Sequence, residues 1–228
     1  MYVLHIGNKN YSSWSLRPWL LMRALDIPFE ERLTPFPAGP SFVLYRSFSP
    51  NGRVPCLVDD GWAVWDSFSI TEYLAERHQD VWPSQAKARA WARSAAAEMH
   101  SSFTALRNLC PMSCGVRVEP LPMSGALRHD IFRMGDLWND GLARFGGPFL
   151  AGDRFGAVDA FFAPIAFRAQ SYGLTFEGEA SAYPRRLLDL PAMREWYAAG
   201  LAETWREPGH EAEVQAAGTV VEDLRATA

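Results

Sequence analysis

The sequence predicts an α/β N-terminal domain followed by an all-helical C-terminal domain. Up to residue 78, short apolar runs with β-type spacing alternate with segments of helical spacing. Two of the short runs are joined by Asp59-Asp60-Gly61, a strong signal for a tight β-hairpin. From Gln85 onward the composition shifts to Ala, Arg, Leu and Met at helical spacing. Strands are therefore expected only in the first part of the chain.

The N-terminal part begins with a predicted strand at residues 2–6. A polar stretch then leads into a buried helix over residues 16–25, whose start we place near residues 13–15 because serines there can cap it. Residues 29–33 alternate apolar with charged side chains, as a half-buried strand does. Pro and Gly residues between 35 and 40 indicate an irregular loop.

The hairpin comprises predicted strands at residues 54–58 and 62–65, and a helix follows over residues 67–77. The resulting order of strands and helices is thioredoxin-like and implies a mixed sheet covered by helices. We place this domain at residues 1–78, a linker at 79–84 and the helical domain at 85–228. Helices of the second domain are predicted at residues 86–109, 124–145, 157–171 and 192–204, with a frayed tail after Gly218.

Composition excludes several classes of protein. A net charge of -4 and a pI near 5.8 leave no cationic excess for a phosphate backbone, so nucleic acid is not expected as a partner. The sequence contains neither a signal-like start nor an apolar run that could span a bilayer, and the three scattered cysteines suit a reducing compartment. We expect a soluble cytoplasmic protein without a metal site, whose cysteines are small core residues.

Four motifs in register resemble those of soluble glutathione transferases. Ser12 to Arg17 stands at the first strand-to-helix turn, Asn51 to Leu57 contains Val54-Pro55, and Asp66-Ser67 opens the last helix of the first domain. The stretch from Phe149 to Asp159 resembles the capping motif of the family's helical domain. The chain is thus similar to this family over both domains, particularly to its serine-type theta, delta and zeta classes.

The resemblance implies the glutathione transferase fold, glutathione as co-substrate and a homodimer. It also implies a cis peptide before Pro55, which would leave the backbone of Val54 free to pair with glutathione like a short added strand. Ser67 and the helix N-terminus suit the γ-glutamyl carboxylate, and Asp66 suits the neighbouring ammonium. Arg53 resembles a position whose side chain reaches a glutathione carboxylate.

The glutathione thiolate is the nucleophile, so the enzyme must stabilise the anion. A serine hydroxyl at a helix N-terminus can donate a hydrogen bond to the sulfur while the helix dipole adds a favourable field. Ser13 matches the donor of delta- and theta-like sequences, whereas Ser12 matches the first serine of the zeta-like pattern. Tyr11 is a further possible donor. Trp14 occupies the place where zeta- and beta-class enzymes usually have Cys.

A second-substrate pocket is expected against the first half of the helical domain, with an apolar wall. Its predicted residues are Trp14, His100, Phe103, Arg107 and Met112. We expect Arg17 to have a structural role. In the capping motif, Gly156 replaces the usual Ser or Thr, and Asp159 is expected to reach back to the helix start as a structural residue.

The sequence therefore predicts a glutathione transferase that conjugates glutathione to a small electrophile. Two alternatives keep the fold: glutathione-dependent isomerisation of a maleyl-type diacid, for which Arg107 or Arg117 would supply positive charge, and peroxide reduction. An alternative of another class is a non-catalytic glutathione-binding or scaffold module, which would need none of the serine, Val-Pro and Asp-Ser motifs.

Overall fold

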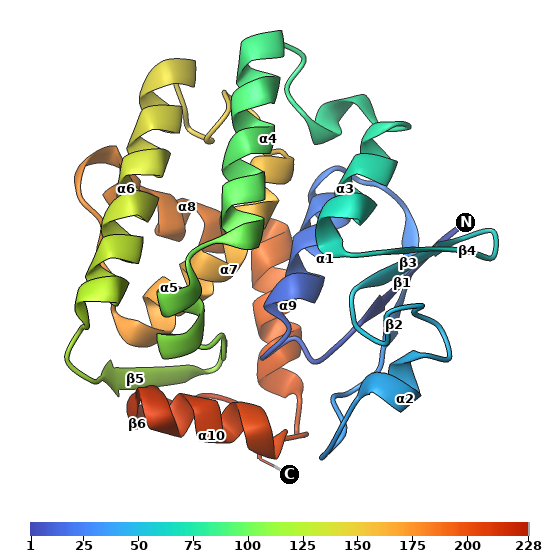
Figure 1. The fold of residues 1–228 in the computed structure, drawn as a ribbon, viewed down its shortest axis with the longest axis vertical. Helices are drawn as coiled ribbons and strands as arrows, with labels where there is room; N and C mark the ends of the chain where they lie inside the picture. Colours follow the sequence, from blue (N-terminus) through green and yellow to red (C-terminus); the bar gives the residue numbers. More distant parts are fainter. Residues whose placement is uncertain (228) are drawn as a thin grey trace.

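The computed structural model describes residues 1–227; Ala228, the last residue of the predicted helical domain, lies outside them. Figure 1 shows the N-terminal elements, in blue to teal, beside a larger group of helices in green to red. The first part contains β1 (Tyr2–Ile6), α1 (Ser13–Ala24), β2 (Phe29–Leu33), α2 (Phe42–Tyr45), β3 (Cys56–Asp59), β4 (Trp62–Trp65) and α3 (Ser67–Ala75). The second contains α4 (Ala86–Ser101), α5 (Thr104–Leu109), β5 (Val116–Pro120), α6 (Gly125–Phe145), α7 (Ala157–Tyr172), α8 (Tyr183–Leu188), α9 (Pro191–Ala202), α10 (Pro208–Ala217) and β6 (Gly218–Asp223).

The four N-terminal strands form one mixed sheet in the order β2-β1-β3-β4. β1 pairs in parallel with β2 and antiparallel with β3, and β3 pairs antiparallel with β4. At the β3–β4 turn, Asp60 and Gly61 have φ values of 47° and 85°, the positive values that a two-residue hairpin turn favours. The predicted α/β domain and its hairpin are confirmed.

β3 starts two residues later than predicted. The peptide between Val54 and Pro55 is cis, as the family resemblance implied. Proline has no N–H to donate to a neighbouring strand, so regular pairing begins only at Cys56, which lies opposite His5 of β1.

α1 joins the two parts of the molecule. Residues 15–22 are all buried, and the helix packs against α3 on its own domain and against α7 and α9 of the helical part. A helix that is covered on both sides has no solvent-facing stripe, which explains its weak amphipathic pattern. α1 therefore lies between the sheet domain and the helices of the second part.

The helical part agrees with the predicted helices at 124–145, 157–171 and 192–204, with small shifts at the ends. The predicted helix 86–109 is instead two helices, α4 and α5. Phe103 lies between them with a φ of 59°, in the left-handed region, so the backbone cannot continue the helix through it. α8 and α10 were not predicted.

The helical part is not purely helical, and its tail is not frayed. β5 and β6 form a separate two-stranded antiparallel sheet. In Figure 1 this sheet and α10 lie along the lower edge of the molecule, and β5 also contacts α7. Val116 and Val118 of β5 are buried while Glu119 is exposed, the alternation typical of a half-buried strand. The expectation of helices alone after residue 85 was wrong at these two segments.

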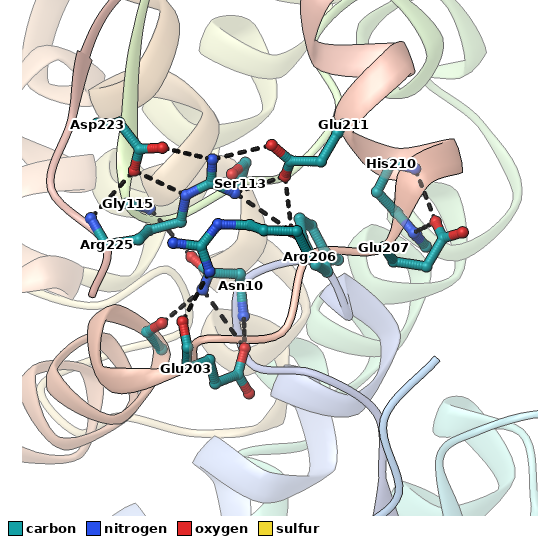
Figure 2. Close-up of polar contacts among 12 residues, drawn as sticks. Asn10, Ser113, Gly115, Glu203, Arg206, Glu207, His210, Glu211, Asp223 and Arg225 are labelled. Carbon is teal, nitrogen blue, oxygen red and sulfur yellow. Dashed lines mark hydrogen bonds and ion pairs between the residues drawn. The ribbon is translucent and has the colours of Figure 1, made fainter. Parts of the chain in front are cut away.

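A polar network fastens the C-terminal segment to the loop after β1. The Arg225 guanidinium donates hydrogen bonds to both carboxylate oxygens of Glu211 and of Asp223, and Tyr11 donates its O–H to Glu211 at 2.6 Å. Figure 2 shows Arg225 between the two carboxylates. Nearby, Glu203 accepts hydrogen bonds from the backbone N–H groups of residues 9 and 10. The last residues of the chain thus support the loop that leads into α1.

The three cysteines, Cys56, Cys110 and Cys114, are free and buried, and burial raises the pKa of each thiol. They are core residues, as predicted. Within residues 1–227, no helix is long and apolar enough to cross a membrane, and no group of three or more potential ligands is placed to hold a metal ion.

Candidate functional site

The serine cluster at the start of α1 separates into two kinds of side chain. Ser12 is the buried N-cap: its Oγ accepts a hydrogen bond from the Ser15 N–H and donates to Ser15 Oγ at 2.7 Å. Ser15 Oγ also accepts a hydrogen bond from the Gly7 N–H. The hydroxyl proton of Ser12 is therefore already used inside the protein.

Ser13 is the first residue of α1 and is only partly buried. Its hydroxyl makes no hydrogen bond to the rest of residues 1–227, and its side chain lines a cavity of about 270 Å³. We call this space the Ser13 cavity. A free hydroxyl at a helix N-terminus, facing a cavity, is suited to donate to an anion.

Tyr11 is not free to act in the same way. Burial and the hydrogen bond to the Glu211 carboxylate raise the pKa of its phenol, and the O–H points to that carboxylate. The Tyr11 ring stacks on His210 with 4.8 Å between ring centroids. Tyr11 lines the Ser13 cavity with its ring while its proton serves the C-terminal network.

A second cavity of about 260 Å³ lies at the start of α3, and we call it the Ser67 cavity. Asp66 caps α3 by accepting a hydrogen bond from the Phe68 N–H at 2.8 Å. Ser67 is 1% exposed, and its Oγ has no hydrogen-bond partner within residues 1–227. The residues around the Ser67 cavity are Trp14, Asn51, Arg53, Val54, Pro55, Asp66, Ser67 and His100.

His100 lies beside Asp66, with 3.5 Å between His100 Nε2 and Asp66 Oδ2. Burial lowers the pKa of the imidazole; the Asp66 carboxylate opposes this shift, and the charges of Arg17 and Arg107 add to it. The lowered pKa favours the neutral ring near pH 7. Asp66 also lines the Ser67 cavity, where a cationic group of a ligand can reach its carboxylate.

The two cavities share Trp14, Arg53 and Val54 as lining residues, so they form adjoining parts of one cleft. Val54 lies outside the strands, and neither its N–H nor its C=O forms a hydrogen bond within the described chain. Arg53 is exposed, and its N–H is bonded to the side chain of Asn51. An extended peptide could thus pair with Val54 while passing from Ser67 towards Ser13.

The structure brings together most of the predicted second-substrate residues. Trp14, Arg107 and Met112 line the Ser13 cavity, whereas His100 lines the Ser67 cavity. Phe103 lies in the hydrophobic core between α4 and α5, 4% exposed, and lines neither cavity. Its left-handed backbone, invisible in a helical pattern, turns this side chain inward.

The sequence did not identify several residues of the Ser13 cavity. They come from the segment in and before α2, from the loop after α5, from α7 and from α10: Phe36, Ser41, Tyr45, Pro111, Arg168, His210 and Glu213. Arg168 lies in an apolar part of α7. A single Arg within an apolar helix is unusual, so the sequence could have marked Arg168 as a candidate site residue. The residues of α10 carried no such signal, because their place depends on the C-terminal network.

Arg17 is buried against aromatic rings. Its guanidinium carbon lies 4.3 Å from the ring centroid of Trp14 and 4.9 Å from that of Phe161. Its Nε and Nη1 have no hydrogen-bond partner within residues 1–227. Arg17 supports the cavity wall through Trp14 without lining either cavity.

Asp159 has the structural role expected of it. It accepts hydrogen bonds from the N–H groups of Gly156 and Leu150 and from the Tyr183 hydroxyl. Burial raises the pKa of its carboxyl to about 6. The capping motif thus fixes the start of α7 from within the core, away from both cavities.

The Ser67 hydroxyl provides a test of whether the Ser67 cavity is built for a ligand. A buried hydroxyl without a partner costs stability, so Ser67→Ala should leave the free energy of unfolding unchanged or raise it by up to about 1 kcal/mol. If this cavity holds the carboxylate of glutathione, the ligand that the sequence resemblance implies, the same change should weaken binding about tenfold, because a hydrogen bond to that carboxylate is lost. Denaturant unfolding and calorimetric titration measure the two effects. Ser69→Ala, an exposed position of the same helix, should change neither; a clear loss of stability in Ser67→Ala would contradict this role.

Comparison with known proteins identifies the family of the chain. The family model for the N-terminal domain of glutathione S-transferases matches residues 11–77, and the model for their C-terminal domain matches residues 124–199. Together they account for more than half of the chain.

Among curated proteins, a stringent starvation protein A homologue of Pasteurella multocida is 26% identical over 147 residues, which is 62% of this chain and 66% of the relative. A probable maleylacetoacetate isomerase of Caenorhabditis elegans is 24% identical over 208 residues, 84% of this chain and 90% of the relative. Among solved structures, a glutathione transferase homologue from Burkholderia GL BGR1 with bound glutathione superposes with a TM-score of 0.66 at 20% identity, covering 87% of this chain and 97% of that one. The two family models and the fold show that the chain is an enzyme of the glutathione S-transferase family.

Proposed function

We propose that the protein binds glutathione across the two cavities and conjugates its thiolate to a small electrophile. The free hydroxyl of Ser13, at the N-terminus of α1 and facing a cavity that adjoins the Ser67 cavity, is the observation that carries this proposal. Ser12 is the weaker candidate donor because its proton is held by Ser15.

In the proposed binding mode, the γ-glutamyl carboxylate meets the Ser67 hydroxyl and the N-terminus of α3. The neighbouring ammonium meets Asp66, which lines the same cavity. The peptide pairs with the backbone of Val54, and Arg53 reaches a glutathione carboxylate from the shared edge of the cavities. This path directs the cysteinyl sulfur towards Ser13.

The reaction balances without a cofactor. Glutathione loses its thiol proton to solvent, and Ser13 and the α1 dipole stabilise the thiolate. The sulfur then forms a bond to an electrophilic carbon, and either a leaving group departs with its electron pair or the resulting carbanion takes a proton. Lowering the thiol pKa by two units requires about 2.7 kcal/mol of preferential stabilisation.

Glutathione-dependent isomerisation is the second candidate, favoured by the similarity to the probable maleylacetoacetate isomerase of Caenorhabditis elegans. Trp14 in place of the usual Cys counts against it. Of the two arginines expected to meet a diacid, Arg107 lines the Ser13 cavity. Arg117 donates to backbone carbonyls and to the Tyr197 hydroxyl instead, and it lines neither cavity.

Asp66→Asn tests the binding mode. An Asn side chain can still cap α3, so the melting temperature should stay close to that of the wild type, while the ammonium loses its counter-charge. We expect the glutathione dissociation constant from calorimetry to rise about tenfold. Asp60→Asn, an exposed position of the hairpin turn, is the matched control and should bind as the wild type does.

A wild-type protein that does not bind glutathione would contradict the proposed function. Wild-type protein that binds glutathione but conjugates no electrophile would instead favour a non-catalytic binding module.

We also propose that the protein works in the cytoplasm as a homodimer, with glutathione as its co-substrate. The domain division at residues 1–78, 79–84 and 85–228 is part of the same proposal. Family membership supports the dimer, and so do the exposed Trp62 and Trp65 on the edge strand β4, 71% and 43% exposed. Large aromatic side chains on an open sheet edge are typical of a surface that a partner covers.

A further inference from the structure

The far wall of the Ser13 cavity carries positive charge that the protein does not neutralise. Arg107 of α5 and Arg168 of α7 line this cavity, and Arg17 lies behind Trp14. The guanidinium carbons of Arg17 and Arg107 lie 4.3 and 4.6 Å from the centroid of the Trp14 ring. Two guanidinium groups thus lie against one aromatic ring, and a third, that of Arg168, lines the same cavity, in a protein whose net charge is negative.

Backbone carbonyl groups hold the two lining arginines in place. Arg107 donates from Nε and Nη2 to the carbonyls of residues 99, 100 and 102. Arg168 donates from Nε to the Cys110 carbonyl at 2.8 Å. Within residues 1–227, Nη1 of Arg107 and both Nη atoms of Arg168 have no such partner. A carbonyl orients a guanidinium but leaves its charge uncompensated.

Carboxylates are scarce around this cluster. Glu213 is the one carboxylate among the described residues that line the Ser13 cavity, against Arg53, Arg107 and Arg168. It forms no ion pair with these arginines in the described part of the chain. Burial lowers the pKa of Arg168 to about 10, and the charge of Arg107 acts on it in the same direction. An anion in the cavity would relieve this mutual repulsion.

We propose that the second substrate is an electrophile that carries a carboxylate, bound by the free guanidinium nitrogens of Arg107 and Arg168. This inference rests on the proposed conjugation and names its substrate class. Trp14 and Met112 provide the apolar surface for the body of the substrate, and the planar fork of each guanidinium matches a carboxylate. A neutral electrophile would gain nothing from these buried charges.

Two aryl chlorides of nearly equal shape test the proposal: 4-chloro-3-nitrobenzoate and 4-chloro-3-nitrobenzamide. With either one, the thiolate sulfur bonds to the ring carbon and chloride leaves. Each kcat/KM is divided by the uncatalysed rate constant with glutathione, which removes the difference in intrinsic reactivity. We expect this normalised kcat/KM of the wild type to be about tenfold or more higher for the benzoate than for the benzamide. The difference should arise from a lower KM for the benzoate.

Arg107→Gln and Arg168→Gln should each reduce this preference about tenfold, and Glu213→Gln should increase it. The matched control is Arg117→Gln, which removes the same charge outside the cavity and should keep the preference. Quenching of tryptophan fluorescence by the unreactive pair 4-nitrobenzoate and 4-nitrobenzamide measures the same selectivity without turnover. If Arg168→Gln does not fold, Arg107→Gln and Glu213→Gln still decide the question.

Equal binding of the charged and neutral probes would overturn the inference, and so would an equal loss of preference in Arg117→Gln. If Arg107→Gln weakened glutathione binding and left benzoate binding unchanged, the arginines would bind glutathione and not the second substrate. The inference would then also fail. The proposed function has a separate test, since it requires glutathione-dependent conjugation of at least the neutral probe, lost in Ser13→Ala.

Discussion

Ser13→Ala is expected to lower kcat/KM for conjugation by about 10- to 100-fold. The hydroxyl donates to a charged sulfur, and a hydrogen bond to a charged group contributes about 1.5–3 kcal/mol. Because the contact is made to the thiolate, the variant should bind glutathione nearly as well as the wild type but with a higher thiol pKa. Thiolate absorbance of bound glutathione against pH measures this shift directly.

Ser12→Ala separates the two serines. Ser12 is the N-cap of α1, so its loss should cost about 1 kcal/mol of unfolding free energy. Once folded, the variant should keep the wild-type thiol pKa, because the Ser12 hydroxyl of the wild type donates its proton to Ser15 Oγ, although Ser12 also lines the Ser13 cavity. If Ser12→Ala raises the thiol pKa and Ser13→Ala does not, our assignment of the donor is wrong.

Arg225→Met is expected to destabilise the protein by about 2–4 kcal/mol. Removing one member of a buried ion pair leaves its partners with uncompensated charge, and such changes typically cost about 3–5 kcal/mol. We expect a smaller loss here than for a fully buried pair, because the side chains of Glu211 and Asp223 are 26% and 42% exposed and so remain partly hydrated. Chemical denaturation measures the loss. Arg185→Met, which breaks an exposed pair with Asp189, is the matched control and should cost less than about 1 kcal/mol.

The same network makes a prediction about pH. Burial acts to raise the pKa of Glu211, but hydrogen bonds from Arg225 and Tyr11 lower it overall, and the hydrogen bond from Arg225 lowers that of Asp223. A folded-state pKa below the unfolded value stabilises the protein above about pH 4 and is lost as pH falls through the folded value. Stability of Arg225→Met should therefore fall less steeply on acidification. An equally steep fall would show that the network does not carry this dependence.

Arg225 is also connected to the Ser13 cavity through its hydrogen-bond partners. Glu211 accepts from Tyr11, and Tyr11 and His210 line the Ser13 cavity. Figure 2 shows how the network reaches from Asp223 to the start of α10. We therefore expect Arg225→Met to raise KM for the electrophile more than KM for glutathione, whose predicted contacts lie mainly in the Ser67 cavity.

Much of the fold was predictable because its signals are local. The hairpin at Asp60 and Gly61, the serine cap at the start of α1 and the capping motif at Asp159 depend on neighbouring residues. β5 and β6 depend instead on pairing between segments about a hundred residues apart. A short alternating run such as Val116 to Pro120 is ambiguous until its partner is known.

The candidate site divides in the same way. The proposed glutathione side lies on motifs at helix starts, so Ser13, Asp66 and Ser67 could be named from the sequence. The proposed electrophile side is assembled from α5, α7 and α10, and no motif connects Arg107, Arg168 and His210. Phe103 was predicted to line the pocket from helical spacing, and that prediction was wrong. Its backbone is left-handed, and its side chain lies in the core.

In the proposed mechanism, the protein holds glutathione as a thiolate at Ser13. Ultraviolet difference titration of glutathione bound to the wild-type protein tests it most directly. We predict that the bound thiol titrates about two pH units below free glutathione and that Ser13→Ala removes most of this shift. Glutathione that binds with the pKa of the free thiol, or a shift that persists in Ser13→Ala, would contradict the claim.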